Sequence, residues 1–485
     1  MLSLSKKKYI ITLFLMMLFM VGCSQNTTTT ITTTHTHTTT TEEEGCPICK
    51  EENYAVLEAM PKLESYTPTT FKVDTVVSTK TEVGDGVNQY KVEYSLNNGK
   101  KAMVIATEVD LTKASIVAGS PINQTTFSKY DTIIAQAEAY EKYNYGVKVL
   151  AGVNADFFGN YKAVNAFVKD SVIVKSGHND NGGYDYTNLS HDLPASMPML
   201  FGVSGTTAQV APIIKNSSVK ETVKSQLFYE VELRRKNITE TLGSDVVLNS
   251  TKAETNKINI VCDYYMDGIA PVNSTVLKLE RHDSNGTRIH GVVTEVIDVA
   301  EKTFFTQTPS EYFVIIPNSM LKTTVEVGDA ISYYVNSKDN TWKYYDTILG
   351  CRQALVLDGK VASTVKLENS NGAQTTNIPR TSVGVKTDGT VVIFSVEALR
   401  YNKKLPVTND DPYGLNLPEL ADFMRYYGIY NGANFDGGGS TQLITREGFN
   451  GSGDFKVVVR SSDFGTYNLN DTRSVINTLL VTTKK

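Results

Sequence analysis

Three short segments of the sequence carry side chains that could do chemistry, although they lie far apart in the chain. The first is Asn154-Ala155-Asp156-Phe157-Phe158-Gly159, which follows a short apolar run. The second is Ile378-Pro379-Arg380-Thr381-Ser382-Val383-Gly384, and the third is Asn434-Phe435-Asp436-Gly437-Gly438-Gly439-Ser440-Thr441. Their carboxylates could orient a water molecule, and their guanidinium, hydroxyl and amide groups could hold an anion such as phosphate.

The run of glycines after Asp436 has two interpretations. Three consecutive glycines cost conformational entropy unless the backbone adopts a positive φ or another group approaches closely. Their amides, together with the hydroxyls of Ser440 and Thr441, could converge on an anion. The alternative is a glycine-rich hairpin turn between two core strands, because the segment lacks the Lys and the strand–loop–helix context of a phosphate-binding loop.

Arg380 also has two interpretations. It stands just before a core strand, from where its guanidinium could hold a phosphate through a planar two-point contact. The alternative is a surface Arg that pairs with a carboxylate.

Strands must position most of these residues. Apolar and polar residues alternate over Tyr66–Val117, as in a half-buried strand. Helical spacing occurs over Asp131–Tyr145, where Gly146 supplies a stop, and over Asn416–Gly428. In the second helix Glu419 stands three residues after a capping Asn, so we assign it to the helix cap and not to catalysis. We therefore predict an α+β fold, with a strand-rich mixed-sheet main domain, a few helices and an inserted β module.

The composition is that of an ordinary globular chain. The 485 residues carry a net charge of −5, with 20% charged and 41% hydrophobic residues. This balance excludes an intrinsically disordered chain, and it argues against a nucleic-acid partner because such binders are usually basic. We expect Cys46 and Cys49 to form a local disulfide, and Cys262 and Cys351 to be small core residues or a second bridge.

The N-terminus has the features of an export signal. Lys6–Lys8 precede the apolar stretch Tyr9–Val21, which is followed by Gly22 and Cys23. The sequence Met-Val-Gly-Cys resembles a bacterial lipoprotein box. It would place a lipid on Cys23 and anchor the chain in the lipid bilayer, on the extracytoplasmic face of a bacterial cell membrane. The alternatives are a plain signal peptide or an N-terminal membrane helix in which Cys23 is incidental.

These patterns divide the chain into five parts. Residues 1–23 are a lipoprotein signal peptide that ends at the lipidated Cys, and residues 24–65 are a Thr-rich tether, because this tract has little to bury. Residues 66–212 and 346–485 form the first and second parts of one main domain. Residues 213–345 form an inserted β-rich module between them.

Taken in order, the three segments resemble the motifs of the phosphodiester glycosidase family, whose lysosomal member uncovers mannose 6-phosphate by removing N-acetylglucosamine. The resemblance extends over Met103–Leu480, and its most specific piece is Asn434–Ser440. Residues that resemble further motifs of the family are Leu349–Gly359, Leu415–Ala421 and Asp471–Val475.

Two positions depart from the family's pattern. Ala155 replaces a Gly of the first motif. The usual Asp-Gly-Arg after the strand reads Glu397-Ala398-Leu399-Arg400. We align Glu397 with the acid and Arg400 with the Arg, although the spacing is longer by one residue.

The resemblance implies a hydrolase that cuts a sugar-1-phosphodiester between the anomeric carbon and a phosphate oxygen, and so releases a free sugar and a phosphate monoester. Ordinary glycosidases protonate a poor alkoxide leaving group with a carboxylic acid. A phosphate is already a good leaving group, so the enzyme mainly has to hold its negative charge while water attacks. One carboxylate that orients the water then suffices.

This activity implies roles for the residues of the motifs. We expect Asp436 or Asp156 to be the catalytic carboxylate, Arg380 and Arg473 to hold the phosphate, and Asn154 to contact sugar hydroxyls or neighbouring loops. The further residues expected to contact substrate are Thr381, Glu397, Arg400, Asn434, Gly437, Gly438, Gly439, Ser440 and Thr441.

Two other functions are compatible with the sequence. The first is a non-catalytic surface lipoprotein that only binds glycans or phosphoglycans, and the altered spacing between Glu397 and Arg400 favours it. The second is a metal-dependent phosphodiesterase that cuts the P–O bond, which the scarcity of His in the motifs disfavours. We expect no required cofactor; a divalent cation near the aspartates is compatible with the sequence, although no ligand spacing demands one. The expected substrate is a sugar phosphodiester or phosphoglycan.

Overall fold

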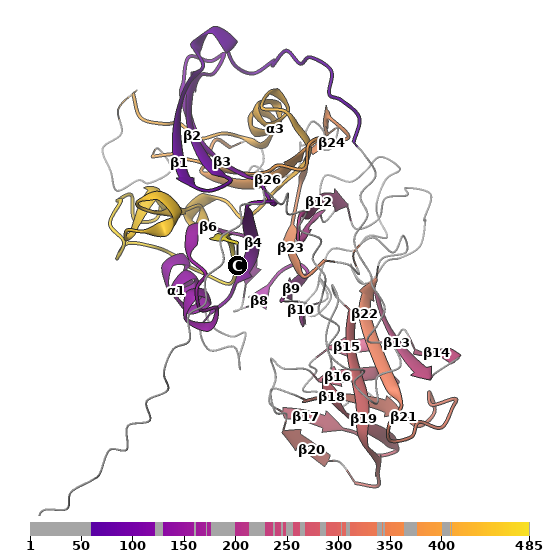
Figure 1. Cartoon of the computed structure of the whole chain (residues 1–485). Coiled ribbons are helices and arrows are strands. Elements are labelled where there is room, and N and C mark those ends of the chain that lie inside the picture. The colour runs from indigo at the N-terminus through magenta and orange to yellow at the C-terminus, as the bar shows by residue number, and fades with distance from the viewer. Residues whose placement is uncertain are drawn as a thin grey trace, which may run out of the picture. The chain divides into compact units, whose positions relative to one another are not determined.

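The structure is a computed structural model, drawn in Figure 1. It describes residues 60–121, 130–159, 162–170, 172–175, 199–212, 228–235, 238–243, 246–248, 256–261, 267–281, 288–301, 303–306, 311–336, 342, 345–362, 376–399, 408 and 410–484. The signal peptide, most of the tether, Cys23, Cys46, Cys49, Cys262 and Arg400 lie outside these residues, so the predictions made for them stay predictions.

The second and third segments lie on neighbouring strands of one sheet. In spatial order this first sheet contains β1 (Val77–Gly84), β2 (Val87–Ser95), β3 (Lys101–Val109), β27 (Val391–Val396), β26 (Arg380–Lys386), β28 (Ile429–Asn434), β24 (Ala354–Leu357) and β25 (Lys360–Val361). Strand β26 pairs with β28 in antiparallel register, with Ser382 opposite Asn434. The middle of the second segment therefore lies beside the start of the third.

The first segment follows a strand of another sheet. In spatial order this second sheet contains β30 (Phe455–Val459), β29 (Leu443–Arg446), β6 (Val149–Asn154), β32 (Thr478–Thr483) and β4 (Ala114–Gly119). All six residues of β6 are buried, as expected for a strand covered on both faces.

Three further groups of strands complete the described part of the chain. A third sheet contains β10 (Val172–Lys175), β9 (Phe167–Lys169), β23 (Thr347–Cys351), β11 (Met199–Ser204) and β12 (Thr207–Pro212). A fourth contains β14 (Ile238–Gly243), β13 (Phe228–Arg235), β22 (Ala330–Asn336), β19 (Arg288–Val299), β18 (Ser274–Arg281), β21 (Glu311–Pro317), β16 (Ile258–Val261) and β15 (Val246–Leu248). Two-stranded pairs are formed by β17 (Asp267–Ala270) with β20 (Thr303–Thr306), β31 (Ser474–Val475) with β5 (Asp131–Thr132), and β7 (Phe158–Gly159) with β8 (Lys162–Ala163).

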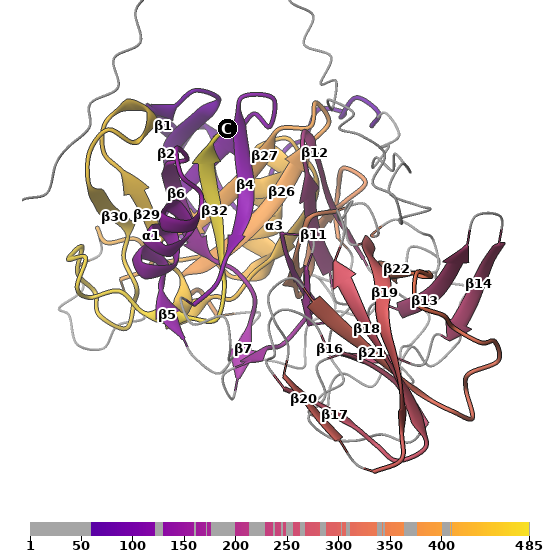
Figure 2. The same ribbon diagram turned by 60° about the horizontal axis from the view of Figure 1, so that its bottom comes forward.

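The two α-helices of the described residues, α1 (Ile133–Tyr143) and α3 (Leu417–Tyr426), cover outer faces of the first two sheets. Phe423 of α3 stacks on Tyr94 of β2, with ring centroids 5.0 Å apart. On the opposite face of β2, Gln89 donates a hydrogen bond of 2.8 Å to Thr445 of the second sheet. Helix α1 packs on the far face of that sheet, as Figure 2 shows. Helix α3, the first sheet, the second sheet and α1 therefore follow one another as layers.

The predicted helices and the strand-rich α+β class are confirmed in outline. The predicted mixed sheet is not found in the three sheets that surround the motifs, because every pair described in them is antiparallel, as in hairpins joined by short turns. A parallel pair, β15 with β16, occurs in the fourth sheet. Cys351 is a buried free cysteine, so the prediction of a core residue is confirmed for it.

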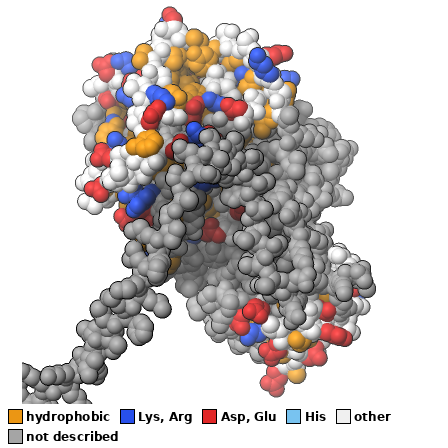
Figure 3. Space-filling model, viewed as in Figure 1, with side chains coloured by type: hydrophobic (Ala, Val, Ile, Leu, Met, Phe, Trp, Pro, Cys, Tyr) orange, Lys and Arg blue, Asp and Glu red, His pale blue; other side chains and the backbone are white. Residues whose placement is uncertain are grey.

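The surface and the helices of the described residues agree with what the composition indicates. Basic and acidic side chains are interspersed over the described part of the face drawn in Figure 3, in keeping with the small net charge. Within the described residues, no helix combines the length and the apolar character that a membrane crossing requires.

Candidate active site

Asn154 joins the three segments. Its Nδ2 donates a hydrogen bond of 2.8 Å to the carbonyl of Asp436. Its Oδ1 accepts hydrogen bonds from the hydroxyl of Thr381, at 2.7 Å, and from the amide of Gln442, at 3.4 Å. The Asn154 residue is only 1% exposed, so these bonds replace water almost completely. The three segments that the sequence analysis selected thus meet around one carboxamide.

Backbone hydrogen bonds hold the same segments together. The Phe435 amide donates to the carbonyl of Thr381 at 2.8 Å, and the Asp436 amide donates to the carbonyl of Ala155 at 3.0 Å. The first bond links neighbouring strands of the first sheet, and the second links that sheet to the end of β6. The candidate site therefore lies where the two sheets adjoin.

Asp436 is a partly exposed carboxylate in a charged setting. Burial raises its pKa most strongly, and the Ser440 hydroxyl, the Gly437 amide and the positive charges of Arg473 and Arg352 oppose this effect. The Gly437 amide donates to Asp436 Oδ1 at 3.0 Å. A carboxylate with a raised pKa, close to two guanidinium groups, is suited to accept a proton or to orient a water molecule.

Asp156, the other predicted carboxylate, lies in a different environment. It is buried, and its two oxygens accept hydrogen bonds from the backbone and side chain of Asn165, at 2.8 and 2.6 Å. Its own amide donates to Asn477 Oδ1 at 3.0 Å. Asp156 therefore fastens the segment around Asn165, and Asp436 is the better catalytic candidate of the two.

The glycine run has a steric reason. A Cβ at Gly439 would lie 2.2 Å from Asp463 Oδ1, so only glycine leaves room for this carboxylate, and Gly438 has a φ of +61°. The amides of Gly437 and Gly438 donate to Asp436 Oδ1 and to Pro379 O. The amides of Ser440 and Thr441 donate to carbonyls within the run, those of Gly437 and Gly438. These four amides already have partners within the protein, and the predicted contact of the run with an anion stays a prediction.

The predicted arginines differ in exposure. Arg380 is 5% exposed, and its Nε and Nη2 donate hydrogen bonds of 3.2 Å to the carbonyls of Leu415 and Thr376. The Arg473 side chain is 38% exposed and forms an ion pair with Asp463. Arg473 is thus placed to meet a ligand, whereas Arg380 fastens two backbone segments to the site.

Two aromatic side chains of the first segment lie against arginines at the partly exposed edge of the site, called the rim below. The Arg473 guanidinium lies 5.8 Å from the ring centroid of Phe158, and the Arg352 guanidinium lies 4.4 Å from that of Phe157. Such contacts limit the freedom of both guanidinium groups. The rim therefore presents two oriented positive charges beside a carboxylate.

The other predicted residues fall into two groups. Thr381, Thr441 and Asn434 are buried and bond within the site: the Thr381 hydroxyl lies 3.3 Å from that of Thr441, and Asn434 Nδ2 donates to Gln353 Oε1 at 3.1 Å. Glu397 instead contacts Arg460 and Tyr467, and it lines a separate cavity.

Four residues that shape the site were not predicted from the sequence: Arg352, Asn165, Asp463 and Asn477. A signal existed only for Arg352, which lies within the Leu349–Gly359 stretch that resembles the family. Its amide donates to the carbonyl of Asn434 at 2.9 Å, because β24 pairs with β28. Among the described residues, no three His, Cys, Asp or Glu side chains gather as a set that could hold a metal ion.

Comparisons with solved structures give distant likenesses. The chain is similar to a hypothetical protein from Synechocystis at 15% identity and a TM-score of 0.49, covering 82% of this chain and 62% of that one, so it spans less than two thirds of that protein. A putative exported protein from Burkholderia pseudomallei has 13% identity and a TM-score of 0.48, covering 88% of this chain and 100% of that one. The zebrafish N-acetylglucosamine-1-phosphodiester alpha-N-acetylglucosaminidase catalytic domain, auto-inhibited by its pro-peptide, has 12% identity and a TM-score of 0.40, covering 89% of this chain and 98% of that one.

Sequence comparison gives a family match over part of the chain. No curated protein sequence matches the chain. The family model of the phosphodiester glycosidases matches residues 295–482, which contain the second and third segments. The resemblance found in the motifs is thereby confirmed, since residues 295–482 of the chain are similar to the phosphodiester glycosidase family.

Proposed function

We propose that the protein is a hydrolase that cleaves a sugar-1-phosphodiester at the anomeric C–O bond and releases a free sugar and a phosphate monoester. The observation that carries this proposal is the meeting of the three motif segments around Asn154, with Asp436 at their centre. The family match over residues 295–482 supports the same reaction class. So does the activity printed in the name of the zebrafish protein.

The side chains at the rim have different roles in this reaction. The phosphate leaves with a negative charge, and Arg473 and Arg352 hold that charge, since both lie near Asp436. Asp436 accepts a proton from the attacking water and stabilises the positive charge that develops on the anomeric carbon. Phe157 and Phe158 are partly exposed and offer apolar surface to the sugar ring.

The position of bond cleavage tests the proposal. The protein is incubated in heavy-oxygen water with a panel of p-nitrophenyl sugar phosphodiesters and UDP-sugars, and the phosphate product is analysed by mass spectrometry. We expect a phosphate monoester without label, because water attacks carbon and not phosphorus. Label in the phosphate would contradict the proposal and indicate P–O cleavage. Saturable binding of the panel without any released sugar would favour the non-catalytic glycan-binding lipoprotein instead.

We also propose that the protein acts at the cell surface, attached to the membrane through a lipid on Cys23. The basic, apolar and small residues before Cys23 and the polar Thr-rich tract after it support this proposal. Replacement of Cys23 by Ala should abolish labelling with radioactive palmitate, since the lipid is attached through that residue. A wild-type protein that takes up no palmitate would contradict the lipid anchor and indicate a plain signal peptide or an uncleaved N-terminal helix.

A further inference from the structure

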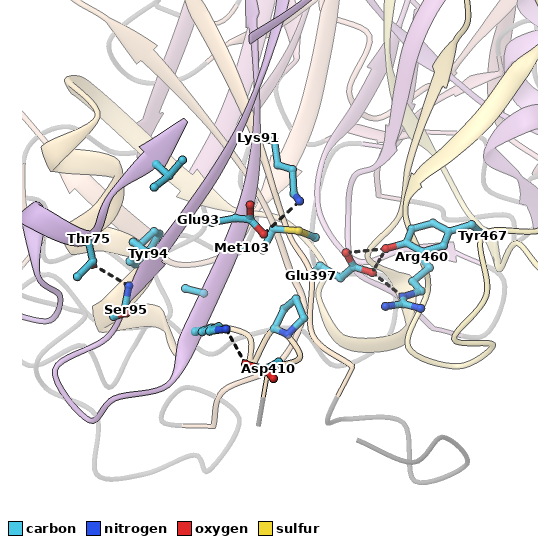
Figure 4. A pocket seen from close by; sticks show the side chains of 14 residues that line it. Thr75, Lys91, Glu93, Tyr94, Ser95, Met103, Glu397, Asp410, Arg460 and Tyr467 are labelled. Atoms are coloured by element: carbon cyan, nitrogen blue, oxygen red, sulfur yellow. Dashed lines mark hydrogen bonds and ion pairs between the residues drawn. The ribbon is translucent and has the colours of Figure 1, made fainter. Parts of the chain in front are cut away.

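A cavity lies at the first sheet, and the residues that hydrogen-bond the three motifs together do not line it. Its volume is about 490 Å³, within the range of small-molecule sites. The ends of β2 and β3 form one side, and Glu397, Arg460 and Tyr467 form another, as Figure 4 shows. Of the residues that line it, Glu397 was predicted from the sequence to contact substrate, and the reaction proposed above uses none of them.

The charges that line the cavity are paired. Lys91 lies 3.1 Å from Glu93, and Lys101 lies 2.7 Å from Asp410. The third pair is Arg460 with Glu397, at 2.5 Å. Three cations thus face three anions, so the cavity offers many hydrogen-bonding groups but no excess of either charge. This balance fits a neutral ligand rich in hydroxyl groups better than a phosphate or a cation.

Tyr467 adds an aromatic surface that is held in place. Its hydroxyl lies 2.8 Å from one oxygen of Glu397 and 3.1 Å from the other. The Arg460 guanidinium lies 4.5 Å from the ring centroid, and the residue is still 48% exposed. A fixed ring beside carboxylate and guanidinium groups suits a pyranose, whose C–H face packs on the ring while its hydroxyls bond to the charged groups.

The segment that supplies this ring continues into the candidate active site. Arg460 is followed by Ser461, whose hydroxyl donates to the carbonyl of Gly439 at 2.5 Å. The same segment carries the exposed side chains Phe464 and Leu469 and ends at the rim residue Arg473. On the other side of the cavity, Glu397 directly follows Val396, which pairs with Arg380.

We propose that this cavity, named here the Glu397 cavity after its buried carboxylate, binds a neutral sugar unit of a glycan. The part of this inference that concerns the substrate rests on the proposed function. The site would make the enzyme act on a sugar phosphodiester that is part of a longer chain, with one unit in the Glu397 cavity and the scissile bond near Asp436.

Calorimetric titration of the full-length protein tests this inference, with chitotetraose, cellotetraose and maltotetraose as probes. We expect saturable binding of at least one tetrasaccharide, and about tenfold weaker binding to the Tyr467→Ala protein. Lys91→Ala is the second variant, because it leaves Glu397 with its partners and should preserve the fold. Tyr145→Ala is the matched control, since Tyr145 is 96% exposed and does not line the cavity.

The outcomes separate this inference from the proposed function. The Asp436→Asn protein should bind the tetrasaccharide with wild-type affinity, whether or not any phosphodiester is hydrolysed by the wild type. Binding without hydrolysis would overturn the proposed function and keep the glycan site. Failure of all three probes to bind, or binding that neither Tyr467→Ala nor Lys91→Ala weakens, would overturn the glycan site.

Discussion

Asp436→Asn is expected to lower kcat by about 10²–10⁴-fold, the range for loss of a positioned general base. The asparagine keeps the shape of the side chain and can still contact the Gly437 amide, but it cannot accept a proton from water. The measurement is the steady-state rate on the best phosphodiester of the panel. Asp85→Asn is the matched control, because Asp85 is an exposed aspartate whose partner, Lys113, is also exposed. A wild-type kcat in the Asp436→Asn protein would show that Asp436 is not the base.

The Asp436→Asn substitution should also change how the stability of the protein depends on pH. Because burial raises the pKa of Asp436, ionisation of this carboxyl costs the folded protein free energy. Below the ordinary Asp pKa of about 3.9 the folded and unfolded chains are both protonated, and the cost is absent. As the pH rises through the raised pKa, the wild type loses this stability and the Asn variant does not. At pH 7 the Tm of Asp436→Asn should therefore equal or exceed that of the wild type, and the difference should vanish in acid.

The hydrolytic activity should also depend on the ionisation of Asp436. Only the carboxylate can act as the base, so kcat/KM should rise with pH through the raised pKa of Asp436. The acid limb of the profile should therefore lie above the ordinary range for an aspartate. An acid limb that is unchanged in Asp436→Asn would contradict this origin.

The locally encoded parts of the protein could be predicted from the sequence. The cap of α3 is an example: Asn416 Oδ1 accepts from the Glu419 amide at 2.9 Å, and Glu419 Oε2 accepts from the Asn416 amide at 3.0 Å. Both partners lie within one helical turn, so their spacing suffices to predict the contact. The residues of the three segments were likewise recognisable because unusual types stand close together in the sequence.

The contacts that span the chain could not be predicted in this way. Asp463 and Gly439 flank the paired strands β29 and β30, and no local pattern encodes which strands pair. The hydrogen bonds of Arg380 could not be predicted either. Its position before a strand suggested that it binds phosphate, whereas its guanidinium donates hydrogen bonds to the carbonyls of Leu415 and Thr376. The roles of the two predicted arginines therefore have to be separated by experiment.

Arg473→Ala is expected to lower kcat by about 10²–10³-fold with little change in Tm, since the side chain is partly exposed and its partner Asp463 is also exposed. Arg380→Ala should instead lower the free energy of unfolding by about 2–3 kcal/mol, because the buried guanidinium bonds to two carbonyls. Urea unfolding and steady-state rates on the same samples measure both effects.

Arg473→Lys provides the sharper comparison. It keeps the charge beside Asp436 but loses the planar pair of donors, so it should restore only part of kcat. Asp463→Asn should have a smaller effect than Arg473→Ala, because it removes the partner of Arg473 and leaves the guanidinium in place. If Arg473→Ala lowered Tm as much as Arg380→Ala and left kcat unchanged, Arg473 would belong to the fold. The phosphate would then have to be held by Arg352, whose guanidinium is already oriented by Phe157.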